Sequence, residues 1–183
     1  MDKNLKILVG IIILIAVYFF SQTNQEKYIE KETSLLKVKP EQIFSFTITD
    51  PSNSITIERN DTTWNIIGHD TLIINQKALD SFFDKVITVK KSTLISKNKN
   101  KWGIYSVHDS NATHLSIFNA EKNLLGSFYI GISKSNYANN YIRTDIDDNV
   151  YMTSDNIFYY VTPIPNYWGE KPPAKNIEPP SLN

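Results

Sequence analysis

The chain has no cysteine among its 183 residues, which excludes disulfide bonds, thiolate zinc sites, thiol nucleophiles and a lipidated N-terminal cysteine. Only Arg59 and Arg143 carry the planar guanidinium fork that grips phosphate or carboxylate in two places. The 19 basic and 19 acidic side chains balance at a formal net charge of zero. Because such a chain has no global field that attracts polyanions, the composition disfavours nucleic acid as a partner.

An uninterrupted apolar run lies near the N-terminus, from Ile7 to Phe20, just after Lys3 and Lys6. A helix over this run and its uncharged neighbours is long enough for the hydrocarbon core of a bilayer, which is about 30 Å thick. Cationic residues before the run and mixed charges after it favour a cytoplasmic N-terminus. The run therefore predicts a single-pass membrane protein that contacts the lipid bilayer here. The rest of the chain would be extracytoplasmic, in the periplasm or at the outer face.

A cleaved signal peptide is the competing interpretation of this run, because its length is close to the upper limit for such segments. Cleavage requires small residues at paired positions. Ala16-Val17-Tyr18 does not fit because of the tyrosine, and Ser21-Gln22-Thr23 fits only weakly. An uncleaved anchor is the favoured interpretation of the two.

The composition divides the chain into four parts. Residues 1–24 are expected to form the transmembrane anchor, 25–40 a charged stalk, 41–162 one extracytoplasmic domain, and 163–183 a proline-rich tail. Short runs of alternating polar and apolar residues, separated by turn-forming residues, predict a series of β-strands. These strands are expected at residues 43–49, 54–59, 63–67, 92–96, 113–119, 124–132, 141–144 and 149–153.

One amphipathic helix is expected between these strands, from a cap at Asn75 to about Val89. Its apolar residues recur at three- and four-residue spacing, which places on one face Leu79, Phe82, Phe83, Val86 and Ile87. The sequence therefore predicts an α+β fold. Its sheet is an antiparallel β-meander with one packed amphipathic helix, and a single N-terminal transmembrane helix precedes it.

The order of several short motifs between Ile55 and Tyr151 resembles the bacterial domain-of-unknown-function family numbered 4340. Each motif is weak alone, and the resemblance is carried by their order and spacing over about a hundred residues. The motifs are Trp64-Asn65-Ile66, the helix Leu79 to Val89, Trp102-Gly103-Ile104-Tyr105, Leu115-Ser116-Ile117, Phe128-Tyr129-Ile130-Gly131, Tyr141-Ile142-Arg143 and Val150-Tyr151-Met152.

The resemblance implies a membrane-anchored extracytoplasmic domain, often encoded beside transporter-like membrane proteins, with no established activity. It therefore implies a membrane protein as partner and an accessory role. This chain departs from the family pattern because it is short, has a single copy of the pattern and has no second hydrophobic segment.

Residue types used in catalysis or metal binding occur without the spacing that such sites require. His108-Asp109-Ser110 contains the residue types of a hydrolytic triad, but consecutive residues do not place a base between nucleophile and orienting acid. His69 and His114 have no partner at a metal-ligand spacing. The run Asp145 to Asn149 is rich in oxygen ligands for calcium, yet Val150 and Asn156 stand where an EF-hand needs glycine and glutamate. A polar hairpin turn explains this run equally well.

Aromatic residues provide the candidate contact surface. Trp64 and Trp102 are expected in the core of the domain. Near the proline-rich tail lies a cluster that can contact a partner or pack the tail onto the domain, formed by Tyr159, Tyr160, Tyr167 and Trp168.

The sequence therefore predicts a non-enzymatic accessory or scaffolding domain. We expect it to have no catalytic residues, no cofactor and no bound metal ion. Its contact with a partner is expected at the aromatic cluster, within a transporter-like membrane complex. The alternative is a module that binds envelope glycan or calcium, which the aromatic cluster and the run Asp145 to Asn149 favour.

Overall fold

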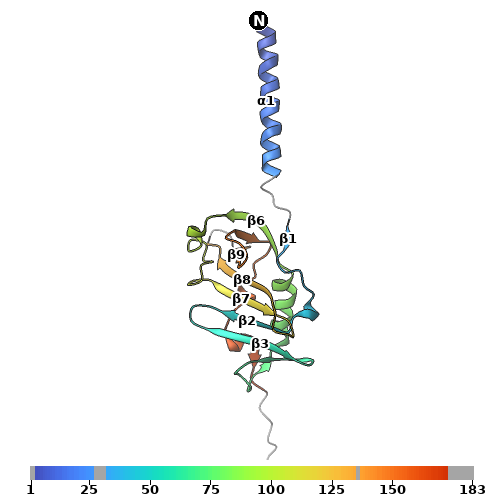
Figure 1. Ribbon diagram of the computed structural model, residues 1–183, viewed down its shortest axis with the longest axis vertical. Helices are drawn as coiled ribbons and strands as arrows, with labels where there is room; N and C mark the ends of the chain where they lie inside the picture. Colours follow the sequence, from blue (N-terminus) through green and yellow to red (C-terminus); the bar gives the residue numbers. More distant parts are fainter. Residues whose placement is uncertain (1–2, 27–31, 135–136, 173–183) are drawn as a thin grey trace, which may run out of the picture.

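The computed structural model describes residues 3–26, 32–134 and 137–172, and its main element is a nine-stranded antiparallel sheet. The strand order is β1-β6-β10-β9-β8-β7-β2-β3-β4 (Figure 1). The strands are β1 (Thr33–Ser34), β2 (Ser45–Thr49), β3 (Ser54–Asn60), β4 (Thr63–Ile66), β6 (Lys90–Ser96), β7 (Thr113–Phe118), β8 (Leu124–Ile132), β9 (Asn140–Thr144) and β10 (Val150–Thr153). A second, two-stranded sheet pairs β5 (Ile73–Ile74) with β11 (Gly169–Glu170).

The helices are short, apart from α1 (Lys3–Glu26). In α2 (Gln76–Ser81) the side chain of Asn75 accepts hydrogen bonds from the backbone N–H groups of Lys77 and Ala78, as expected of an N-cap. The chain then continues as a π-helix, η2 (Phe82–Ile87). The remaining helical turns are η1 (Pro40–Gln42), η3 (Lys99–Lys101), η4 (Phe158–Tyr160) and α3 (Pro165–Trp168).

The predicted α+β fold is wrong, because the molecule is a mostly antiparallel β structure with a few short helices. The expected strands form close to their predicted positions, but they do not follow one another as a simple meander. β2 pairs with β7, and β6 pairs with β10. The segment of α2 and η2 carries the chain from β4, at one edge of the sheet, to β6, near the other edge. Three of the eight strand pairs in this sheet, β1 with β6, β6 with β10 and β2 with β7, therefore join segments distant in sequence, which alternation alone does not specify.

The prediction of a transmembrane helix also needs correction. Within the described ranges, no helix is both long enough and apolar enough to span a bilayer. The prediction of a single-pass membrane protein with an extracytoplasmic domain depended on that helix and is therefore not supported either. In Figure 1, α1 lies away from the sheet, and its described apolar side chains are exposed.

Part of the predicted stalk belongs to the folded unit. Thr33–Ser34 forms the edge strand β1 beside the start of β6, and Leu36 is buried. Leu36 packs so closely on β8 that a side chain at Gly126 would overlap it, since a Cβ there would lie 2.7 Å from the Leu36 Cδ1 atom. Of the predicted tail, residues 163–172 are described, and the remainder lies outside the described residues.

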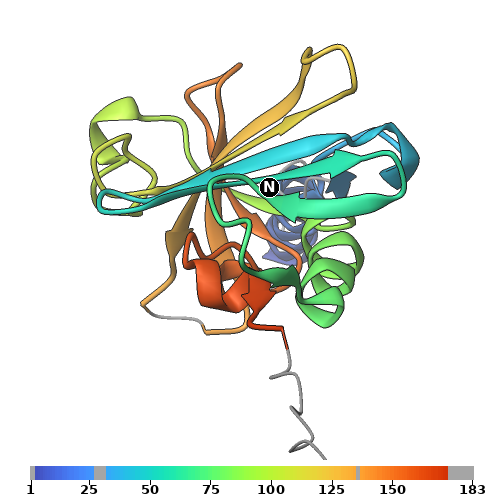
Figure 2. The same ribbon diagram turned by 90° about the horizontal axis from the view of Figure 1, so that it is seen from below.

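The core lies on one face of the sheet, beneath the helical segments. Figure 2 shows α2, η2 and α3 on the same side of β2 and β3, and the strands fan out with a strong twist. Trp168 is fully buried there. Its ring meets Phe46 of β2 edge-on at 5.3 Å and Phe82 of η2 at 5.9 Å, and its Nε1 donates a hydrogen bond to the Thr162 carbonyl oxygen at 2.7 Å. One side chain thus joins the C-terminal segment, the helix and the sheet.

We predict that Trp168→Ala lowers the free energy of unfolding by about 3–5 kcal/mol, because it leaves a large cavity and an unpaired carbonyl group. Trp168→Phe should cost less, since it keeps most of the ring. Tyr159→Ala should stay within about 0.5 kcal/mol, because that side chain is largely exposed. Urea denaturation of the three variants measures this order, and equal losses for Trp168→Ala and Tyr159→Ala would contradict the assigned core.

Candidate binding surfaces

The structure leaves one of the four predicted contact residues largely exposed, half-buries two of them and buries the fourth. Tyr159 is 71% exposed, and the half-buried Tyr160 and Tyr167 of the same C-terminal segment lie near each other. Trp168 is in the core, where its ring supports Tyr167 edge-on at 5.1 Å. We call Tyr159, Tyr160 and Tyr167 the tyrosine surface.

Burial raises the pKa of Tyr167 above its ordinary value, and the neighbouring Tyr160 raises it further. The phenol therefore stays protonated over the physiological range and keeps its O–H donor. One exposed and two half-buried tyrosines in this segment present apolar rings with polar tips, a combination that favours contact with other molecules.

A stack of cationic and aromatic side chains lies on the opposite face of the sheet from the main core. Sequence reasoning did not identify it. The guanidinium of Arg143, a buried residue on β9, lies between two rings, 3.8 Å from the Trp102 centroid and 3.7 Å from the Tyr129 centroid. The stack continues on both sides. The His114 ring lies parallel to Tyr129 at 4.3 Å, and the Lys99 ammonium is 4.8 Å from the Trp102 centroid.

The polar contacts of Arg143 explain how a buried cation is held in this stack. Its Nε donates a hydrogen bond to the Val107 carbonyl oxygen at 3.1 Å. Its terminal nitrogen forms an ion pair of 2.6 Å with Asp109, whose side chain is largely exposed. Together with the cation–π contacts, these bonds tie the loop between β6 and β7 to the sheet.

The ion pair between Arg143 and Asp109 also explains how His108, Asp109 and Ser110 are arranged. The Asp109 carboxylate faces Arg143, whereas His108 Nδ1 lies 3.0 Å from the Ser110 hydroxyl and also accepts the backbone N–H of Ser110. Asp109 therefore orients the arginine and not the histidine. The three residues form a polar turn, and the geometry of a hydrolytic triad is not present in them.

His114 is the centre of a polar surface on this face of the sheet. Its Nε2 is 2.7 Å from the Ser127 hydroxyl. Burial lowers the pKa of His114, the carboxylates of Asp145 and Asp109 oppose this change, and Arg143 adds to it. Cross-strand neighbours extend the surface as paired hydroxyl groups, Thr47 with Thr56 and Thr49 with Ser54, each at 2.9 Å. We call this region the hydroxyl face, defined by Thr47, Thr49, Ser54, Thr56, His114, Ser116 and Ser127.

The calcium candidate Asp145 to Asn149 is the turn between β9 and β10. The carboxylate of Asp147 accepts the backbone N–H of Asn149 at 2.8 Å, and the carbonyl oxygen of Asp148 accepts the Trp102 Nε1–H at 3.0 Å. In the part of the chain that the structure describes, no group of three or more histidine or acidic side chains is placed to hold a metal ion. His69 lies exposed in the turn after β4, where its N–H donates to the Ile66 carbonyl oxygen.

A family model for a domain of unknown function, DUF4340, matches residues 64–182. The match covers most of the chain, so the chain belongs to this family, as the order of its motifs indicated. Searches of curated proteins and of solved structures gave no match. The family description assigns no activity.

We predict that His114 makes the protein less stable in mild acid. Because burial lowers the folded-state pKa of His114, the unfolded chain takes up the proton first, near its ordinary pKa of about 6.5. The free energy of unfolding should therefore fall as the pH is lowered from about 6.5 through the folded-state pKa, and His114 should have no such effect above this window.

Urea denaturation at several pH values tests this dependence with His114→Gln, which removes the titrating group and keeps hydrogen-bonding capacity. His69→Gln, at an exposed position, is the matched control. A pH slope for His114→Gln identical to that of the wild type would contradict the prediction.

Proposed function

We propose that this member of the family is a non-enzymatic accessory or scaffolding domain that binds a protein partner through the tyrosine surface. The observation that carries the proposal is the exposed Tyr159, next in the chain to the half-buried Tyr160, which lies near Tyr167. Tyrosine is enriched at protein interfaces because its ring contributes apolar area and its hydroxyl a hydrogen bond, at a low cost in conformational entropy.

The support beneath this surface favours binding with little rearrangement. Tyr167 packs on the buried Trp168, and Tyr160 belongs to the short turn η4, where its N–H donates to the Ile157 carbonyl oxygen at 3.0 Å. Residues fixed in this way lose little freedom when a partner binds, so more of the contact energy remains for affinity. The expected transporter-like partner and the expected bilayer contact of Ile7 to Phe20 remain untested predictions.

A photo-crosslinking amino acid at position 159 tests the proposal in cells that express the full chain at native abundance. We expect one dominant crosslinked protein. The same amino acid at Ile67, another exposed position, should not capture it. Tyr167→Ala in the position-159 background should weaken the crosslink several-fold. Identical crosslink patterns at 159 and 67, or no crosslink at 159, would contradict a partner at this surface.

A glycan-binding module is the second candidate, and the hydroxyl face favours it. The face presents hydroxyl groups beside the stacked rings of His114 and Tyr129, and carbohydrates are bound by such a combination of hydrogen-bonding groups and ring surfaces. If glycan binding is the function, the full chain should bind soluble envelope glycan fragments on an array. Ser116→Val should then reduce binding, and Tyr159→Ala should not. Binding that Ser116→Val leaves unchanged would rule out this face.

A further inference from the structure

The longest strand of the sheet, β8, has an unpaired edge along part of its length. β9 pairs with β8 only over residues 128–132, from Phe128 with Thr144 to Ile132 with Asn140. On its other side β8 pairs with β7 from Leu124 to Ile130, with a register shift between Leu124 and Gly126. At residues 124–127, no described strand lies on the β9 side. The backbone groups that point to this side are therefore available to another strand.

A groove of about 480 Å³ runs along this edge. Leu124 to Phe128 line it along β8, and Thr144 to Asp147, the residues that continue from the end of β9, line it as well. The lining therefore places the groove beside the strand edge, where a further strand would lie.

The chain on the other side of the groove is held away from β8. After Thr144 the chain leaves the sheet in the turn that the Asp147 carboxylate closes on the N–H of Asn149. The segment 33–37 lines the groove from the core side, where Leu36 packs against Gly126. Apolar side chains remain uncovered at the rim, since Leu124 is 55% exposed and Ile146 is 91% exposed. An apolar lining beside a free strand edge is the arrangement used in β-strand addition.

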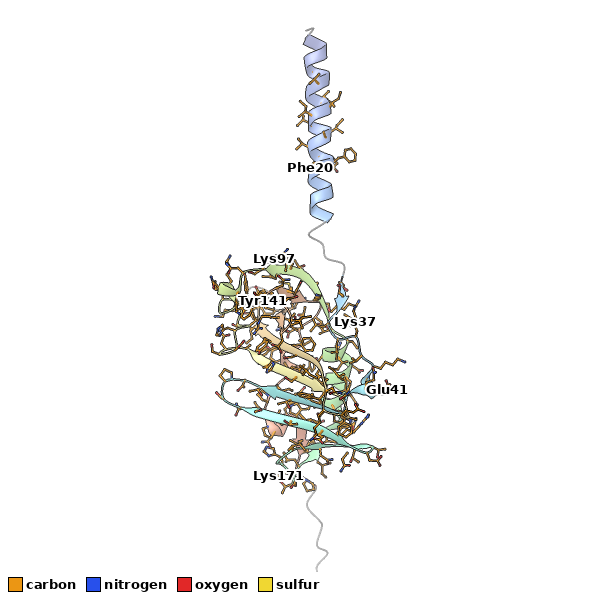
Figure 3. The ribbon with its side chains drawn as sticks, viewed as in Figure 1. Phe20, Lys37, Glu41, Lys97, Tyr141 and Lys171 are labelled. Carbon is orange, nitrogen blue, oxygen red and sulfur yellow. The ribbon has the colours of Figure 1, made fainter. Side chains whose placement is uncertain are left out.

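Charges of opposite sign lie at different parts of the rim. Lys37 and Lys91 come from the segments of β1 and β6, whereas Asp145 and Asp147 come from the turn after β9. Figure 3 shows Lys37 on the flank of the domain opposite Tyr141. An occupant complementary to this rim carries an acidic side chain near the lysines and a basic side chain near the aspartates.

We propose that this groove binds an extended peptide segment of a partner protein, which adds a strand beside residues 124–127 of β8. The inference rests on the proposed role as a binding domain and names a second contact and the chemistry of its partner. The segment contributes backbone hydrogen bonds to β8, alternate apolar side chains to the groove, and one acidic and one basic side chain to the charged rim.

A phage-displayed library of random peptides, selected on the full chain, tests the proposal with a defined probe. The enriched peptides should alternate apolar residues and carry one acid and one base. In fluorescence anisotropy, Lys37→Glu and Asp145→Lys should each weaken binding by roughly tenfold, the size expected for losing a favourable charge contact and gaining an unfavourable one. Lys77→Glu is the matched control, because Lys77 is exposed and does not line the groove.

A charge swap sharpens the test, since a peptide whose acid is replaced by lysine should regain affinity for Lys37→Glu. Bound peptide should also shift the backbone amide NMR signals of Gly126 and Ser127. The proposal fails if no peptide is enriched, or if enriched peptides bind the two groove variants as tightly as the wild type. If such peptides instead lose binding to Tyr159→Ala, the groove is excluded while the role as a binding domain stands.

Discussion

The burial of Trp168 is the contact on which the arrangement of the domain depends. Its ring meets β2 through Phe46 and the helical segment through Phe82, and these two rings stack on each other at 4.0 Å. Backbone hydrogen bonds also join the C-terminal segment to the rest of the domain. The Asn75 N–H donates to the Trp168 carbonyl oxygen at 2.7 Å, and β11 pairs with β5. The C-terminal segment is thereby part of the core, and the tyrosine surface rests on it.

Arg143 has a comparable role on the opposite face. A buried guanidinium is costly unless its donors are paired, and here the Val107 carbonyl oxygen, the Asp109 carboxylate and two aromatic rings surround it. The loop of residues 97–112 is held against the sheet as a result, and the stack ends at the hydroxyl face. The two buried anchors thus stabilise different faces, so the tyrosine surface and the hydroxyl face can be altered by mutation separately.

Local patterns in the sequence predicted local structure well, and they failed where distant residues decide the outcome. Alternation located the strands, and Asn75 was recognised as a cap because both features depend on neighbouring residues. The pairing of β2 with β7, the continuation of α2 as a π-helix and the Arg143 stack were not predicted, since each depends on segments that meet only in the fold. Trp168 was assigned to a contact surface for the same reason. The transmembrane prediction, drawn from hydropathy, is corrected by the absence of a spanning helix among the described residues.

Native-state amide hydrogen exchange most directly tests the central claim, that the C-terminal segment is part of the core and supports the tyrosine surface. If Trp168 anchors this segment, the amides of Val161 and Tyr167 should exchange only through the global unfolding that also exposes the interior of β2 and β7. Exchange of these amides through a local opening of much lower free energy, while β2 and β7 stay protected, would contradict the claim.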